Sequence, residues 1–208
     1  RSDTLYGTSI SSDNINLDPG HLTTLLSRYY GRTFPLGGLG GVPFVGKTGY
    51  TAFASHVPAN GHVLIVFGPH IGFSPTGEPG KFLRKGQVST SAACGALSAA
   101  YSQVLSGKSF GADSSDWQQA WLRTKLNGAI AEASVSAKPM VQLALGAYKV
   151  IEQEILDIVT TEYGLGKLVL LGGIQINMPY PMPGYFMPLH FSIRSRNMDP
   201  VDLMSTFD

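Results

Sequence analysis

Short apolar stretches bounded by glycine and proline predict the strands of this chain. Residues 63–67 (VLIVF) are continuously apolar and end at Gly68-Pro69, which is typical of a strand that is covered on both faces. An alternating stretch at residues 4–10 and two later stretches, at 167–178 and 186–193, also have strand length.

Apolar side chains spaced three to four residues apart predict helices between these strands. One helix is expected from Pro19 through Tyr29 with Asp18 as its cap, and another from near Ser91 through Val104. Later helices are expected after the acidic pair Asp113 and Asp116, with breaks at Gly128 and Pro139, and from about residue 140 to 161. Strands that alternate with helices predict an α/β fold, with a central, mostly parallel sheet flanked by helices. We expect one domain over residues 1–208.

The composition narrows the classes of protein that fit. Charged residues make up 14% and apolar residues 43% of the 208 residues, which is too apolar for a disordered tail. A net charge of +1 argues against a general nucleic-acid binder, and no apolar run approaches the roughly 18 residues that span a bilayer. The 25 glycines predict tight turns. Because a surface with so few charged residues is poorly solvated, we also expect the protein to bury part of its surface against a second copy.

One segment matches the phosphate-binding pattern G-x-x-x-x-G-K-[ST] at residues 41–48. In a true phosphate loop a buried strand precedes the first glycine, and backbone N–H groups wrap the phosphate. Here the preceding residues make a poor strand, and Pro43 lacks the N–H donor. We therefore interpret the segment as a glycine-rich turn into a helix.

Two residues combine a reactive side chain with a favourable place in the predicted fold. His70 follows the strongest strand directly, and α/β proteins place their sites at the carboxyl ends of parallel strands. Cys94 is the only cysteine and falls in the first turn of a predicted helix, where unpaired N–H groups stabilise a thiolate. Each also has a structural interpretation, His70 as a packed histidine and Cys94 as a small buried residue.

The chemistry of this pair has two interpretations. One thiolate and one imidazole make half of a zinc site, because catalytic zinc takes three protein ligands and water. The same two groups could form the nucleophile and base of a thiol hydrolase. The single cysteine excludes an intrachain disulfide and a multi-thiolate metal cage. His56 ends an apolar stretch and Asp13 follows the first strand. The remaining histidines are expected in solvated or structural roles, namely His21, His62 and His190.

Several segments together resemble the limiting-CO2-inducible proteins of algae, also called theta-type carbonic anhydrases. Their order and spacing cover most of the chain, so the match is specific as a set. The segments are SISSDNI at 9–15, GLGGVPFVGKTG at 38–49, ASH at 54–56, GPHIG at 68–72, GEPGK at 77–81, SAACGA at 91–96, GGIQIN at 172–177 and YFMPL at 185–189.

The resemblance implies a fold like that of β-carbonic anhydrases, a homodimer, and zinc held by Cys, His and Cys for the interconversion of CO2 and bicarbonate. By position, His70 and Cys94 become metal ligands, Asp13 the carboxylate beside the metal, and His56 a pocket histidine that shuttles a proton. The first cysteine ligand of the family is expected two residues before the aspartate, where this chain has Ser11. A chloroplast location and a part in a CO2-concentrating mechanism are also implied, and the start Arg-Ser-Asp, without an apolar signal segment, is expected of a processed chain.

The serine leaves three outcomes open. Asp13 could become the third ligand, the site could be weak or empty, or Ser11 could be an introduced change in an active enzyme. The expected function is therefore a zinc-dependent carbonic anhydrase, a lyase, impaired by Ser11. The alternative is a non-catalytic dimeric scaffold or regulator that keeps the fold.

Overall fold

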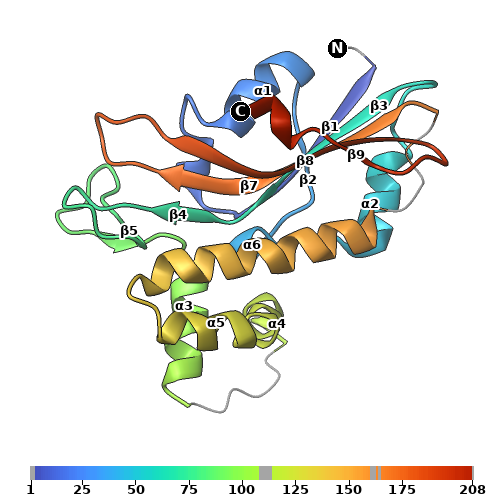
Figure 1. Cartoon of the computed structure of the whole chain (residues 1–208). Coiled ribbons are helices and arrows are strands. Elements are labelled where there is room, and N and C mark those ends of the chain that lie inside the picture. The colour runs from blue at the N-terminus through green and yellow to red at the C-terminus, as the bar shows by residue number, and fades with distance from the viewer. Residues whose placement is uncertain (1–2, 108–113, 160–162, 164, 208) are drawn as a thin grey trace.

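A mixed sheet forms the centre of the protein (Figure 1). The computed structural model describes residues 3–107, 114–159, 163 and 165–207. Within these, the strand order is β2-β1-β3-β7-β8-β9, and β4 continues the line of β3 by pairing with the end of β7. All pairs among β1, β2, β3, β4 and β7 are parallel, whereas β8 and β9 are antiparallel additions, which confirms the predicted mostly parallel sheet. The strands are β1 (Thr4–Ile10), β2 (Phe34–Pro35), β3 (His62–Gly68), β4 (His70–Gly72), β7 (Lys167–Asn177), β8 (Tyr185–Ser195) and β9 (Val201–Asp202).

Helices flank the sheet on both faces. The long helix α6 runs along one face with α3, α4 and α5 beyond it, and α1 covers part of the other face (Figure 1). The α-helices are α1 (Leu22–Tyr30), α2 (Gly46–Ala54), α3 (Gly95–Leu105), α4 (Trp117–Lys125), α5 (Asn127–Ser134) and α6 (Pro139–Ile158). A two-stranded hairpin of β5 (Lys81–Phe82) and β6 (Ser91–Ala92) lies at the β4 end of the sheet, and 3-10 turns occupy η1 (Asn14–Leu17), η2 (Leu39–Gly41) and η3 (Met204–Phe207). In the described part of the chain, no helix combines the length and apolar character needed to cross a membrane.

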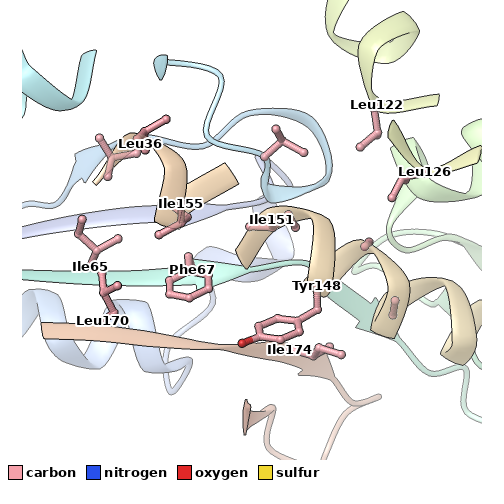
Figure 2. Packing of buried hydrophobic residues seen from close by; sticks show 14 of the residues in the cluster. Leu36, Ile65, Phe67, Leu122, Leu126, Tyr148, Ile151, Ile155, Leu170 and Ile174 are labelled. Carbon is pink, nitrogen blue, oxygen red and sulfur yellow. The ribbon is translucent and has the colours of Figure 1, made fainter. Parts of the chain in front are cut away.

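The central strand β3 explains why the chain folds around it. Ile65 and Phe67 point into the cluster under α6, whereas Leu64 and Val66 pack on the α1 side, so both faces are covered as the continuous apolar run predicts. Figure 2 shows Phe67 against Tyr148 of α6, and these rings stack with centroids 6.2 Å apart. Burial of such apolar area is the main favourable term that fixes α6 on the sheet.

Two predicted helix starts are wrong. Asp18 does not cap α1, because the helix begins at Leu22 with His21 in the N-cap position, and Asp18 instead ends η1. Helix α3 begins at Gly95 rather than near Ser91, because Ser91 pairs in β6. Cys94 is consequently the N-cap residue of α3.

The later helices agree better with the sequence. Asp116 occupies the N-cap position of α4, although its side chain makes no capping bond, and Asp113 lies outside the described residues. Pro139 is the first residue of α6, which ends at Ile158, and residues 160–162 lie outside the described part. Gly128 is not a break but lies inside α5, since the chain turns at Leu126.

Three glycines allow the backbone segments beside the site to touch. A Cβ on Gly41 would meet the carbonyl oxygen of Gly68, one on Gly68 that of Gly173, and one on Gly173 that of Met187. Gly68 also has φ of +143°, in the region that side chains disfavour. This row places the end of β3 against both η2 and β7, and it explains part of the glycine excess.

The segment with the phosphate-loop pattern is a turn into a helix, as predicted. Helix α2 begins at Gly46, and Lys47 is exposed. Val42 is buried, and Phe44 packs edge-on against Trp117 and Trp121. The apolar residues of the pattern thus serve packing.

Candidate metal centre

The structure brings together three residues that are far apart in the sequence. Ser11 follows β1, His70 opens β4 after β3, and Cys94 precedes α3. Because β1 and β3 are parallel and in register from Thr4 and His62 onward, their carboxyl ends meet at one edge of the sheet. The Ser11 Oγ lies 3.5 Å from the Cys94 Sγ in a buried contact. These side chains therefore lie together at the edge of the sheet where the candidate site is predicted.

The thiol and the imidazole are both withdrawn from water. His70 is 0% and Cys94 2% exposed. Burial raises the pKa of the Cys94 thiol, but hydrogen bonding and charge from His70, with smaller contributions from Ser11 and the backbone of Leu97, outweigh it and lower the pKa to about 7. Burial likewise lowers the pKa of His70, yet the neighbouring Cys94 outweighs it and the pKa is raised. The pair therefore favours a thiolate beside an imidazolium.

This electrostatic coupling predicts the pH range of the thiolate. In metal-free protein the ultraviolet absorbance of the Cys94 thiolate should rise through about pH 7, instead of near the ordinary value of 9. In His70→Ala the same transition should move upward by at least one pH unit, because the largest lowering influence is removed while burial stays. If the absorbance of the wild-type protein instead rises near pH 9, the coupling between Cys94 and His70 is wrong.

Asp13 is held at the edge of the pair by an arginine. Its Oδ2 lies 2.6 Å from Arg84 Nη2 and 3.7 Å from His70 Nε2, while its Oδ1 accepts from the backbone N–H of Ile15. Arg84 is itself fixed by donating from Nη1 to Ser91 Oγ and to the Ala92 carbonyl. Both carboxylate oxygens are thus engaged, so Asp13 is oriented toward His70 without being free to turn.

The inner side of His70 faces a buried polar network. Its Nδ1 lies 2.8 Å from Asn177 Oδ1, at the end of β7. Asn177 Nδ2 contacts Asn16 Oδ1, and Asn16 Nδ2 donates to the carbonyl oxygen of Ser11. His21 also belongs here, through a 2.6 Å contact of its Nδ1 with Gln175 Nε2.

The other histidines lie in several environments. His56 is exposed after α2, and its ring packs 6.3 Å from that of Phe34, so its role as a shuttle stays a prediction. His21, for which a solvated or structural role is expected, is 6% exposed and contacts Gln175, so only the structural role agrees with the fold. His62 accepts from the backbone N–H of Lys167, and His190 contacts Glu152 and Ser192, both in structural settings.

The donors at this edge can be compared with the needs of zinc. His70 Nε2 is a buried nitrogen with no hydrogen-bond partner of good geometry among the described residues, and it faces the side where Asp13 and Cys94 lie. An imidazole nitrogen and a thiolate are both common zinc ligands. In the described part of the chain, His, Cys, Asp and Glu groups do not assemble a set of three by themselves. The pair fits zinc, and the Ser11 hydroxyl stands where a third ligand would be needed.

A cavity of about 600 Å³ reaches this edge from the α1 side of the sheet. Its lining includes Ser11, Asp13 and Asn16, together with hydroxyl side chains such as Thr8 and Thr23. A small molecule could therefore approach the loop after β1 from this side.

Sequence reasoning missed two residues of the centre. Arg84 lies between β5 and β6 in a loop that shows no motif, and its partner Asp13 is 71 positions away. Asn177 ends the GGIQIN segment, whose resemblance to the family was the only available signal, and it contacts His70 across 107 positions.

Comparison with known proteins identifies the family. The family model of limiting CO2-inducible proteins B/C beta carbonic anhydrases matches residues 1–195. The solved structure of PtLCIB4, a homolog of the limiting CO2-inducible protein LCIB, is 32% identical, with a TM-score of 0.83 over 96% of this chain and 84% of that chain. A histidine-to-alanine variant of PtLCIB4 is also 32% identical, with a TM-score of 0.85 over 97% of this chain and 84% of that one.

LCIB itself, 22% identical with a TM-score of 0.68 over 97% of this chain and 84% of that chain, agrees in fold. No curated protein sequence matches the chain. The sheet, the buried histidine–cysteine pair and the family match over 195 residues lead to one conclusion. The chain belongs to the limiting CO2-inducible proteins B/C beta carbonic anhydrase family.

Proposed function

We propose that this protein is a zinc-dependent carbonic anhydrase whose metal affinity is reduced because Ser11 replaces a thiolate ligand. The observation that carries the proposal is the convergence of the buried His70 imidazole and the low-pKa Cys94 thiol at the carboxyl edge of the sheet. The family, described as beta carbonic anhydrases, supports the same activity.

The residues of the centre would have separate roles in holding the metal and orienting the nucleophile. His70 and Cys94 would hold the zinc, with the neutral Ser11 hydroxyl as a weak third donor. Zinc, when bound, supplies the Lewis acidity that activates water at neutral pH. Asp13 pairs with Arg84 and faces the His70 Nε2 side at 3.7 Å, where it can accept a hydrogen bond from the nucleophile and orient it toward CO2.

Asp13 is better suited to this orienting role than to metal ligation. A carboxylate that accepts from Arg84 at 2.6 Å would lose a charge-assisted hydrogen bond if it turned to the metal, and it would release the cap of η1 at Ile15. The first of the three outcomes left open by the sequence, with Asp13 as third ligand, is therefore the least consistent with these contacts.

The lack of a third strong metal ligand also favours a second function. Two strong ligands without a third are also what a non-catalytic relative would retain, and such a protein would act as a scaffold or regulator. We propose a homodimer in either case, because large apolar side chains are exposed, among them Leu17 at 73% and Tyr180 at 97%.

Zinc binding and CO2 hydration measured on the same preparation separate the two functions. The chain should bind zinc at a one-to-one ratio when the metal is in micromolar excess, and it should hydrate CO2 faster than the buffer in a stopped-flow assay. Cys94→Ala is the control and should lose both, because one imidazole remains. If wild-type protein binds no zinc and hydrates CO2 no faster than Cys94→Ala, the carbonic anhydrase function is wrong and the scaffold function remains.

A further inference from the structure

A chain of buried hydrogen bonds leads from the backbone at Ser11 to the inner nitrogen of His70. The two amides in this chain, Asn16 and Asn177, are each 2% exposed. Asn16 Nδ2 lies 3.1 Å from the Ser11 carbonyl oxygen, and Asn177 Nδ2 lies 3.3 Å from Asn16 Oδ1. The last contact is the 2.8 Å distance between Asn177 Oδ1 and His70 Nδ1.

The direction of every bond in this chain follows from its first member. A backbone carbonyl oxygen can only accept, so Asn16 must present its NH2 group to Ser11 and its oxygen to Asn177. Asn177 must then present its own NH2 group to Asn16 and its oxygen to His70. Turning Asn177 around would set two oxygens against each other, which buried polar groups avoid.

An amide oxygen that faces His70 Nδ1 accepts a hydrogen bond from the N–H of that nitrogen. The lone pair of the neutral imidazole is then on Nε2, the buried nitrogen on the side of Cys94, which lies 3.7 Å from Asp13 Oδ2. With the opposite tautomer, Nε2 would carry the proton and could not bind a metal, and Nδ1 would face the Asn177 oxygen with no proton to donate.

We propose that Asn177 is a positioning residue that keeps a proton on His70 Nδ1 and so reserves Nε2 for the metal. The part that concerns metal affinity rests on the proposed function, whereas the hydrogen-bond direction does not. The chain of hydrogen bonds that ends at His70 starts at the backbone carbonyl oxygen of Ser11, so its direction does not depend on the side chain at position 11.

The same strand offers a matched control. Gln175 lies two residues before Asn177 on β7, is also 2% exposed, and donates from Nε2 to the Tyr185 carbonyl oxygen and toward His21. Gln175→Leu and Asn177→Leu each remove one buried amide from the same face of β7, but only Asn177 contacts the His70 ring. Asn177→Asp keeps an oxygen that can accept from Nδ1, although it loses the N–H that Asn177 donates to Asn16 Oδ1.

Imidazole nitrogen resonances of the metal-free protein, labelled with ¹⁵N-histidine and recorded at a pH above the titration of His70, where its ring is neutral, test the hydrogen-bond direction. In wild type, Gln175→Leu and Asn177→Asp, the Nδ1 of His70 should show the shift of a protonated nitrogen and its proton should be protected from exchange. In Asn177→Leu that protection should be lost. A wild-type His70 with an unprotonated Nδ1, or an Asn177→Leu variant that retains the protected proton, would overturn the proposal.

Cobalt titration of the same four proteins tests the consequence for the metal. Asn177→Leu should bind cobalt about 10- to 100-fold more weakly than Gln175→Leu, the usual loss when a histidine ligand loses its outer partner. Equal affinities of these two variants would overturn the positioning role. If wild type binds no cobalt while the Nδ1 proton is protected, the proposed function fails and the hydrogen-bond direction stands.

Discussion

Ser11→Cys is expected to raise zinc affinity by two to three orders of magnitude. The Ser11 Oγ already lies 3.5 Å from the Cys94 Sγ, and the residue is 7% exposed, so the new thiol would enter the centre without a change of backbone. Structural zinc sites with four ligands bind with roughly 10–16 kcal/mol, which is about 2.5–4 kcal/mol for each ligand. At about 1.4 kcal/mol for each factor of ten, one added thiolate accounts for the expected gain.

Competition with a chromophoric chelator measures this change. The assay needs a reducing agent, since two neighbouring thiols can form a disulfide. Ser12→Cys is the matched control, because it adds a thiol one position later on an exposed residue and should leave the affinity unchanged. CO2 hydration by Ser11→Cys should rise at limiting zinc. Equal zinc affinity of Ser11→Cys and wild type would show that Ser11 is not at a ligand position.

Gly68→Ala should destabilise the folded protein more than any other single methyl group added near the site. The new Cβ would overlap the carbonyl oxygen of Gly173, which is backbone of β7 and cannot rotate away. The φ of +143° adds strain for any side chain, so we expect a loss of about 3 kcal/mol or more in the free energy of unfolding.

Urea unfolding compares this variant with Gly128→Ala. Gly128 lies inside α5 and is exposed, and an added Cβ there meets no atom within 4 Å. Gly128→Ala should therefore stabilise the protein by up to about 1 kcal/mol through helix propensity. If Gly68→Ala unfolds at the same urea concentration as wild type, the close approach of β3 and β7 is described wrongly.

The parts of the fold that could be predicted are those in which one local pattern decides the outcome. The run at 63–67 is apolar at every position, and a strand buried on both faces requires that pattern. The two-residue strands β2 and β9 carry no such pattern, since they form only because a neighbouring strand offers partners. The helix start predicted near Ser91 is wrong because this residue pairs in β6, where its hydroxyl accepts from Arg84.

The candidate site divides in the same way. His70 and Cys94 could be found because a strand end and a helix start are visible in the sequence, and parallel strands bring such ends to one edge. Arg84 lies 71 residues from its partner Asp13, and Asn177 lies 107 residues from its partner His70. Local periodicity contains no information on such pairing, so these two contacts required the tertiary structure.

X-ray absorption at the zinc edge tests whether His70 and Cys94 hold the metal. For zinc-loaded wild type we expect one sulfur at about 2.3 Å and one imidazole nitrogen at about 2.0–2.1 Å, with the remaining ligands oxygen. Ser11→Cys should show two sulfurs under the same conditions. A wild-type spectrum without any sulfur ligand, or with no bound zinc, would contradict a centre built on His70 and Cys94.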